Sequence, residues 1–284
     1  MIKLAAVAMA ILVAAPAQAG ELETVFFKND PDKVEQAAQA MLKRAPADPE
    51  ANAWLAETAM KQGKWATAQT ALEKAGTGTL TGLLAHGDFA WYTGQMAEAE
   101  GYFRKALAIA PTDTHAKWGV SSALLHQDVL GDNLTGALDL AEELEKQGDK
   151  LDPDFHAWVQ VLIGACVGYQ ADKGSMLDKL RLAPRVKGAF ERALALSPKN
   201  PNALTGLGRY YLLAPGLLGD SGKAVEYLGR ANDMDPFFYL NDAYYIRALL
   251  HDKQTNKAKA EAAFYRAKFQ ELSEPAAELA RVKI

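Results

Sequence analysis

Small and bulky apolar positions alternate with polar ones in a pattern that returns along the chain. Four such positions reappear 31 residues further on: Gly63, Ala68, Leu72 and Ala75 return as Gly94, Ala99, Phe103 and Ala106. A repeat of this length is typical of helical solenoids, in which each repeat is one helix hairpin. Each copy predicts an apolar helix, a glycine turn and a second helix whose alanines allow close packing around one bulky side chain.

A proline closes three of the predicted hairpins. Pro111, Pro198 and Pro236 each follow a second helix where the chain must leave it, since proline cannot continue a helix. Together with the spacing above, these residues resemble the tetratricopeptide repeat superfamily. The resemblance covers nearly the whole chain after residue 19, and it implies a fold that mostly displays surfaces for binding.

The pattern predicts one continuous all-α repeat domain. We expect a helix over 30–43, begun by Asp30 and Pro31, and then hairpins over 48–75, 79–110, 112–146, 154–196, 202–231 and 240–269. The fourth hairpin is expected to carry a linker over 172–182 before a helix that begins at Pro184, and a stretch over 274–283 is expected to cap the end. The predicted fold is a tetratricopeptide-repeat-like right-handed helical solenoid of about six hairpins. Residues 20–47 form its N-terminal helix and partial repeat, and residues 48–284 form the repeat domain.

Two connections, 126–133 and 214–221, are longer than the others, and both contain Leu-Gly-Asp. One interpretation is a longer turn whose leucine packs under the hairpin and whose aspartate caps the next helix. The other is a pair of apolar loops that close over something held in the solenoid, as functional loops on rigid scaffolds do.

The segment 204–228 carries a more particular resemblance. It contains Leu-Gly-Arg-Tyr-Tyr-Leu-Leu-Ala-Pro-Gly at 207–216, followed by Gly219, Asp220 and Lys223. It is similar to periplasmic repeat proteins related to the T-component associated with TRAP transporters. That resemblance implies a solenoid with an apolar groove or pore, a periplasmic substrate-binding protein or transporter as partner, and a hydrophobic ligand. The lipoprotein cysteine of that group is missing here.

Residues 1–19 have the pattern of a secretory signal peptide: Lys3, an apolar run over 4–15 and the small-x-small site Ala17-Gln18-Ala19. We expect cleavage before Gly20 and a location in a Gram-negative periplasm. The apolar run has about 12 residues, fewer than the roughly 20 that span a bilayer, and no later stretch of that length lacks charges, so no transmembrane segment is expected after cleavage. The net charge of −4 gives no basic footprint, which argues against a nucleic-acid partner.

No motif in the chain assembles a catalytic set. The five histidines are spread over four predicted hairpins, and His115 and His126, which share one, are 11 residues apart, roughly 16 Å along a helix and too far to bind one metal. Phosphate-binding glycine loops, a nucleophile elbow and His-Glu-x-x-His are all missing. We therefore expect no enzyme activity, no cofactor and no metal site. Cys166 is the single cysteine, which excludes an internal disulfide. Beside Gly164 and Gly168 it fits a buried small hydrophobe at a close helix contact, with a reactive thiol as the alternative.

The resemblance to the superfamily implies that the first helix of each hairpin lies on the concave side of the solenoid. This assignment of positions, the superfamily register, defines a candidate binding groove. Its predicted lining is mostly apolar and aromatic: Leu84, Trp91, Tyr92, Trp118, Leu125, Val161, Tyr169, Arg209, Leu212 and Leu213. One position of these first helices, occupied by Glu57 in the first full hairpin and Asp88 in the next, has no run of basic residues from hairpin to hairpin. A clamp for a peptide carboxylate is therefore not expected. The alternative is ordinary core, if the solenoid curls until its inner face touches itself. The polar tips of tryptophan and tyrosine favour a binding surface, where one end stays wet.

These observations predict a non-enzymatic periplasmic repeat protein that acts as a binding or adaptor component of a transport or envelope pathway. Its groove would hold a segment of a periplasmic or envelope protein partner, or a hydrophobic ligand. The alternative is a periplasmic carrier of a hydrophobic small molecule or lipid, such as a sterol or fatty acid, that works with a membrane transporter. A carrier needs an enclosed apolar cavity of a few hundred cubic ångströms, whereas a scaffold needs an open groove or patch.

Overall fold

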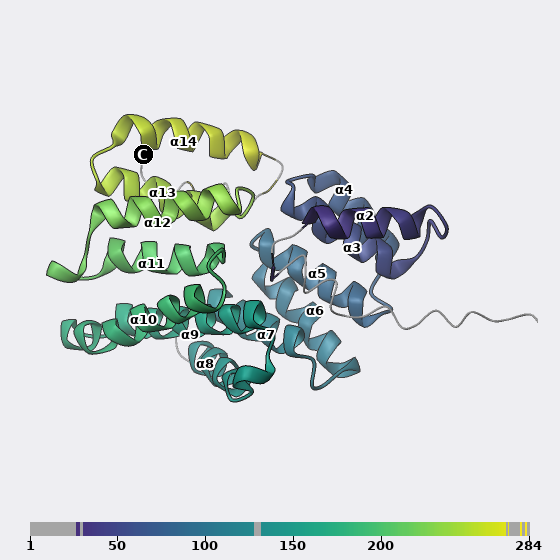
Figure 1. Cartoon of the computed structure of the whole chain (residues 1–284), viewed down its shortest axis with the longest axis horizontal. Coiled ribbons are helices and arrows are strands. Elements are labelled where there is room, and N and C mark those ends of the chain that lie inside the picture. The colour runs from purple at the N-terminus through teal and green to yellow at the C-terminus, as the bar shows by residue number, and fades with distance from the viewer. Residues whose placement is uncertain are drawn as a thin grey trace, which may run out of the picture.

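The structure is a computed structural model that describes residues 27–28, 31–127, 132–270, 272, 279 and 282. Across these residues the chain forms α-helices and two short 3₁₀ turns, with no β-strand. The helices are α2 (Pro31–Leu42), α3 (Pro49–Lys61), α4 (Trp65–Ala75), α5 (Leu80–Tyr92), α6 (Met96–Ile109), α7 (Thr114–Gln127), α8 (Asp132–Glu145), α9 (Pro153–Lys173), α10 (Met176–Leu196), α11 (Pro201–Leu213), α12 (Ser221–Met234), α13 (Tyr239–His251) and α14 (Thr255–Lys268). They follow one another as antiparallel hairpins in a solenoid, which confirms the predicted all-α repeat fold (Figure 1).

The glycine turns of the first two full hairpins form as the repeat predicts. Gly63 and Gly94 have φ angles of 68° and 90°, in the left-handed region that favours glycine, and each ends the turn between two helices. In the second of these hairpins the bulky Phe103 is fully buried. A Cβ placed on Gly119 would lie 2.4 Å from the Phe103 ring, so the missing side chain is what lets α6 and α7 approach each other.

The fourth hairpin differs from the prediction. The linker expected over 172–182 is wrong, because α9 continues to Lys173 and α10 already begins at Met176. Ser175 starts α10 with a capping box: its hydroxyl accepts from the Asp178 amide at 3.2 Å, and the Asp178 carboxylate accepts from the Ser175 amide at 3.0 Å. Pro184 therefore lies inside α10 rather than at its start. Both helices have 21 residues, against 13 in α11, so this hairpin is the longest of the solenoid.

The second Leu-Gly-Asp connection follows one predicted feature and departs from another. Asp220 caps α12, its Oδ1 accepting from the Lys223 amide at 3.0 Å, as expected. The 3₁₀ turn Gly216–Leu218 does not tuck its leucine under the hairpin, however, since Leu217 is fully exposed. The first such connection, at 128–131, lies outside the described residues.

The solenoid curls until its first and last hairpins meet (Figure 1). The ring of Trp65, at the start of α4, packs against that of Phe269, just after α14, with centroids 6.2 Å apart. In the turn before α4, a Cβ on Gly63 would lie 2.3 Å from the ring of Phe237, so only glycine leaves room for it. The inner face of the solenoid thus touches itself. This is the arrangement that the sequence analysis gives as the alternative to an open binding groove.

Three further sequence predictions fall outside the described residues: the signal peptide over 1–19, the start of the first helix at Asp30 and most of the stretch over 274–283. Among the helices that the structure does describe, none combines the length and apolar character needed to cross a membrane.

Candidate functional site

An aromatic cluster fills the inside of the superhelix. It consists of Phe27, Trp91, Trp118, Trp158 and Phe238, which come from five separate segments and are each at most 4% exposed. Trp91 stacks on Phe238 with ring centroids 4.9 Å apart and planes 11° from parallel. Trp118 meets Trp158 edge to face at 5.4 Å. Such stacked and perpendicular pairs are the favoured geometries of aromatic rings, so the cluster is packed as a core.

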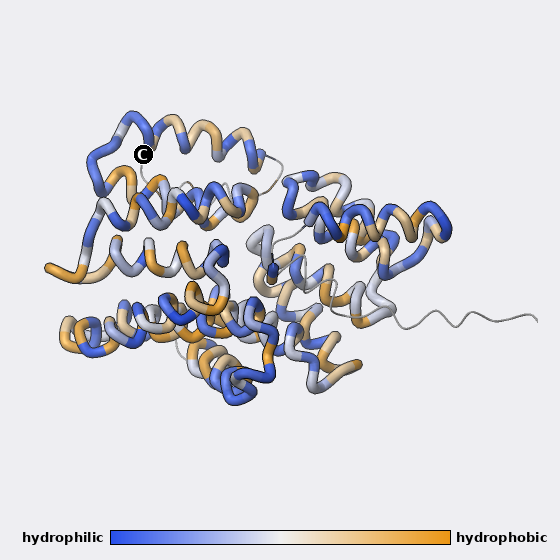
Figure 2. Tube along the Cα trace, in the orientation of Figure 1, coloured by the Kyte–Doolittle hydropathy of each residue, from blue (hydrophilic) through white to orange (hydrophobic). Residues whose placement is uncertain are grey.

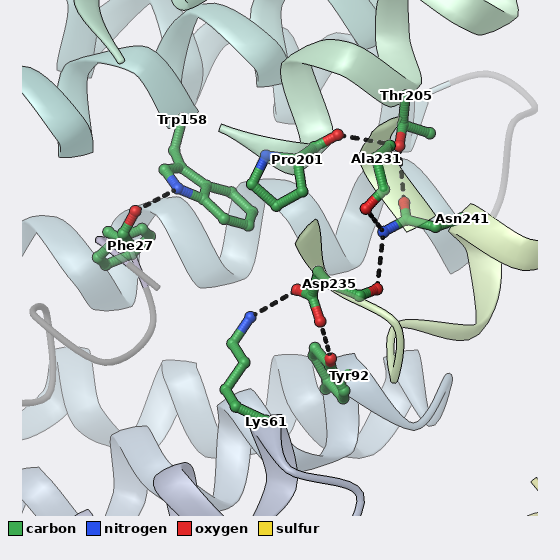
Figure 3. Close-up of polar contacts among 9 residues, drawn as sticks. All are labelled: Phe27, Lys61, Tyr92, Trp158, Pro201, Thr205, Ala231, Asp235 and Asn241. Carbon is green, nitrogen blue, oxygen red and sulfur yellow. Dashed lines mark hydrogen bonds and ion pairs between the residues drawn. The ribbon is translucent and has the colours of Figure 1, made fainter. Parts of the chain in front are cut away.

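Phe27 brings the N-terminal segment into this cluster. Its ring contacts Trp118 edge-on at 5.2 Å, and its carbonyl accepts a hydrogen bond of 3.0 Å from the Trp158 indole (Figure 3). The next residue, Lys28, pairs with Asp152 at 3.0 Å. Phe27 therefore lies against the concave face and covers part of what an open solenoid would expose.

The ring of hairpins is closed by one buried ion pair. Lys61 Nζ, at the end of α3, lies 2.9 Å from Oδ2 of Asp235, which follows α12, and both side chains are 2% exposed. Tyr92, at the end of α5, donates its hydroxyl to the other oxygen of Asp235 (Figure 3). Burial, and then the charge of Asp235, raise the pKa of Tyr92 well above its ordinary value of 10.0. The phenol therefore stays a donor, and one carboxylate holds both ends of the solenoid.

A second polar group lies buried on the same inner face. His115 Nε2 lies 2.9 Å from Oδ1 of Asp88, and Glu57 is beside them at 1% exposure. Burial, and then the charge of Asp88, raise the pKa of Glu57 well above its ordinary value of 4.5. The arrangement favours a neutral Glu57 in the folded chain. Among the described residues, no group of three or more His, Cys, Asp or Glu side chains is arranged to hold a metal ion.

One cavity adjoins the aromatic cluster, and a second shares a wall with the first. The inner cavity, about 60 Å³, lies between Trp91, Trp118, Trp158 and Phe238 on one side and Arg209 on the other. The outer cavity, about 110 Å³, lies between α9, α10 and α11 and is lined mainly by apolar and aromatic groups. Its lining comprises Gly164, Ala165, Gly168, Tyr169, Ala171, Asp172, Lys179, Ala183, Val186, Phe190, Gly206, Arg209, Tyr210, Leu213, Ala214 and Pro215.

Glycines and an arginine shape the wall that the two cavities share. A Cβ on Gly206 would lie 2.2 Å from the Phe190 ring, so the missing side chain lets that ring pack against α11. The Arg209 guanidinium lies over the rings of Tyr169 and Tyr244, at 5.2 and 4.4 Å from their centroids. Burial, and then the charge of Arg209, lower the pKa of His126 in the inner cavity to about 4. This end of the inner face therefore carries a cation beside a neutral imidazole.

The ten predicted groove residues divide into three groups. Leu84, Trp91, Tyr92, Trp118 and Leu125 are buried, at 3% exposure or less. Val161, Tyr169, Arg209 and Leu212 are half-buried, and Leu213 is 59% exposed. Trp91, Trp118, Leu125, Val161 and Arg209 line the inner cavity, and Tyr169, Arg209 and Leu213 line the outer one. Whether any of them binds a partner stays a prediction.

Several residues of the inner face were missed from the sequence. Phe238 precedes α13 and Tyr244 lies within it, in the last hairpin, which contributes none of the predicted groove residues. Phe190 belongs to the second helix of its hairpin, a position that the register assigns to packing between repeats. The sequence signal for its position is the pair Gly164 and Gly206, whose missing side chains leave room for the Phe190 ring. Cys166 is fully buried, and burial raises the pKa of its thiol to about 12, so the prediction of a buried small hydrophobe is confirmed.

Comparison with known proteins agrees with this geometry. A tetratricopeptide repeat family model matches residues 84–154, which run from α5 to the start of α9. The chain is similar in structure to a tetratricopeptide repeat protein of Thermus thermophilus, with a TM-score of 0.57 at 15% identity over 72% of this chain and 98% of the other. It is also similar to one from Parabacteroides merdae, with a TM-score of 0.53 at 12% identity over 93% and 97%. No curated protein sequence matches the chain.

These findings define the class of protein. The chain has the all-helical fold of a tetratricopeptide-type solenoid, and the family model identifies a tetratricopeptide repeat within residues 84–154. Proteins of this class generally act as scaffolds or adaptors that bind other proteins through their helical surfaces.

Proposed function

We propose that the protein is a non-enzymatic adaptor of the bacterial envelope that binds an apolar segment of a partner at the outer cavity. The observation that carries this proposal is the cavity itself, an apolar pocket between α9, α10 and α11 whose mouth includes the exposed Leu213. A pocket with an apolar lining and a few polar groups, here Arg209 and Lys179, is the common form of a binding site.

The size of the cavities favours a partner segment over an enclosed lipid. Ligand pockets for small molecules usually measure about 300–1,000 Å³. The outer cavity holds about 110 Å³ and the inner one about 60 Å³. Such volumes suit one or two apolar side chains rather than a sterol or a fatty acid. To enclose a lipid as a carrier does, the superhelix would have to open, and opening would break the ion pair between Lys61 and Asp235.

The proposed setting is the periplasm, and it rests on sequence. Residues 1–19 have the signal-peptide pattern, and the segment 204–228 is similar to T-component proteins that partner periplasmic substrate-binding proteins. That segment includes α11 and the connection to α12, so it forms one wall of the outer cavity. A substrate-binding protein or a transporter is therefore the proposed kind of partner.

Site-specific photocrosslinking in the native host tests the proposal. A photoreactive residue in place of Leu213 is expected to yield a discrete adduct with one envelope protein. The same residue in place of Phe264 on α14, which is 63% exposed, serves as the matched control and is expected to yield none. The cavity-filling substitution Ala183→Trp should abolish the adduct at Leu213, because Ala183 lines the cavity.

Two outcomes would contradict the adaptor proposal. Equal adducts at Leu213 and Phe264 would mean that the cavity has no special role. A retained lipid in native mass spectrometry of the exported protein, with no protein adduct, would favour the carrier.

A comparison of stability with binding separates site from core among the predicted groove residues. Trp118 is 2% exposed, so Trp118→Ala is expected to leave a cavity and cost about 3–5 kcal/mol of unfolding free energy. Leu213→Ala should leave stability nearly unchanged and weaken binding by about 1–3 kcal/mol, as the loss of an interface anchor does. If Trp118→Ala instead spares stability and abolishes binding, the aromatic cluster is the site.

A further inference from the structure

The inner cavity has a polar side with one sign of charge. Among the described residues that line it, Arg209 is the only one charged at neutral pH, and none is an aspartate, a glutamate or a lysine. Metal cations prefer carboxylate and carbonyl oxygens as ligands, and this lining offers no carboxylate. Figure 2 shows that the chain around it, in α9, α11 and α13, mixes hydrophilic and hydrophobic positions. The lining therefore suits a small anion.

One face of α11 supplies most of this polar side. Asn202, Thr205 and Arg209 are three and then four residues apart, so they share a face of the helix, and all three line the cavity. The Thr205 hydroxyl donates to Oδ1 of Asn241 at 2.6 Å (Figure 3). Asn202 is only 9% exposed, and its Nδ2 has no hydrogen-bond acceptor among the described residues. A buried amide in this state costs free energy, so an acceptor placed in the cavity would stabilise it.

Two residues of α7 complete the polar side from across the cavity. Ser122 Oγ accepts a hydrogen bond of 2.7 Å from the indole of Trp91. Since the indole uses a lone pair of that oxygen, the serine hydroxyl keeps its own proton to donate. His126 lies one turn further along α7 and also lines the cavity. Its imidazole is neutral at pH 7, because burial and the charge of Arg209 lower its pKa to about 4.

The size of the cavity selects among small anions. It measures about 60 Å³, whereas an apolar cavity that holds a benzene ring measures about 150 Å³. The inner cavity therefore has room for a group of about three heavy atoms, which is the size of a carboxylate. A phosphate is larger and carries more charge than one arginine balances. The aromatic walls at Trp118, Trp158 and Phe238 suit the carbon that a carboxylate carries.

We propose that the inner cavity binds the carboxylate of a small organic acid of the size of acetate or propionate. Arg209, the amide of Asn202 and the hydroxyl of Ser122 donate to its two oxygens, and the aromatic cluster contacts its carbon stem. One arginine and neutral donors form this site, so it differs from the peptide clamp built on a run of basic positions. Arg209 lines both cavities, but binding of an acid to the isolated chain does not depend on the adaptor role.

Titration of the full chain with sodium propionate tests the proposal through tryptophan fluorescence, since Trp91, Trp118 and Trp158 line the cavity. The expected result is a saturable change in emission with half-saturation in the millimolar range. Propionamide has the same shape without the charge and should bind at least about tenfold more weakly. Sodium chloride at equal ionic strength should give no saturable change.

Variants place the bound acid in the cavity. Arg209→Gln should weaken propionate binding by at least about tenfold, and Asn202→Leu, which removes the amide at similar size, by several-fold. The matched control is Arg230→Gln, because Arg230 also lies over a tyrosine ring, that of Tyr227 at 5.8 Å, but lines neither cavity. It should bind propionate as the unchanged chain does. Circular dichroism confirms that each variant is folded, and if Arg209→Gln is not, Asn202→Leu and propionamide still decide the outcome.

Four outcomes would overturn the proposal. No saturable response to acetate or propionate means that the cavity holds only water. Equal binding of propionate and propionamide means that the cavity recognises shape and not charge. Unchanged binding by folded Arg209→Gln means that the acid binds elsewhere. Binding of N-acetylleucine without binding of propionate means that the site takes the end of a longer molecule. Each of these can occur whether or not the adduct at Leu213 forms, so the two proposals fail separately.

Discussion

Replacing Asp235 by asparagine should strongly destabilise the protein. The substitution keeps an acceptor for the Tyr92 hydroxyl but removes the charge that faces Lys61. Both side chains of the ion pair are 2% exposed, so water cannot replace the lost partner. Removing one member of a buried pair costs about 3–5 kcal/mol, because the other charge is left uncompensated. The Tyr92 ring lies 4.7 Å from Lys61 Nζ and offsets part of this loss, so we expect about 3 kcal/mol.

Urea unfolding followed by circular dichroism measures this effect as a lower midpoint with an unchanged slope. Lys61→Met together with Asp235→Asn should cost less than the sum of the single changes, since neither member of the ion pair then stays buried and charged without the other. The control is Glu191→Gln, which breaks an exposed pair with Lys187 and should change stability by less than about 0.5 kcal/mol. A loss below about 1 kcal/mol for Asp235→Asn, or strict additivity of the double variant, would refute the view that this pair closes the ring.

Three further outcomes are expected. Gly206→Ala should cost about 1–3 kcal/mol because its Cβ would meet the Phe190 ring at 2.2 Å, whereas Gly168→Ala, whose nearest neighbour is 3.7 Å away, should be nearly neutral in the same urea assay. The pKa of His126 is lowered from 6.5 to about 4, so its contribution to stability is fully present above pH 6.5 and is lost as the pH falls through 4. His126→Asn should flatten the stability profile between these values, and an unchanged profile would contradict the assignment. N-terminal sequencing of exported protein should begin at Gly20, and a chain that retains Met1 would exclude the signal peptide.

The hairpins could be predicted because their signals are local. The spacing of glycine, alanine and one bulky residue within a single repeat sets both the turn and the close helix contact, as Gly94 and Phe103 show. The sequence predicts a helix start at Pro184, because proline is typical of a first helical position, whereas the capping box at Ser175 is the stronger signal and marks the actual start of α10. A proline inside a helix removes one hydrogen bond, and a long, well-capped helix tolerates that loss.

The candidate site was harder to predict because it depends on where distant repeats meet. The register placed Trp91 on the inner face correctly, but it could not show that Phe238 would stack on it. Exposure along a solenoid depends on its curvature, which sums small rotations over all the hairpins and has no signature in any one of them. The same holds for Glu57 and Asp88, which the register places on the concave side and which lie buried.

The contact of Lys61 with Asp235 joins positions 174 residues apart, and this sets the chain apart from an open array of repeats. In an open array each unit touches only its neighbours, so units can be gained or lost at either end with little effect on the others. A closed ring has a fixed circumference. Duplicating or deleting one hairpin here would move the two partners out of register and break the closure, even if every remaining hairpin folded. The number of repeats in this protein is therefore constrained by its geometry, and changes during evolution should accumulate in its loops and on its outer helices.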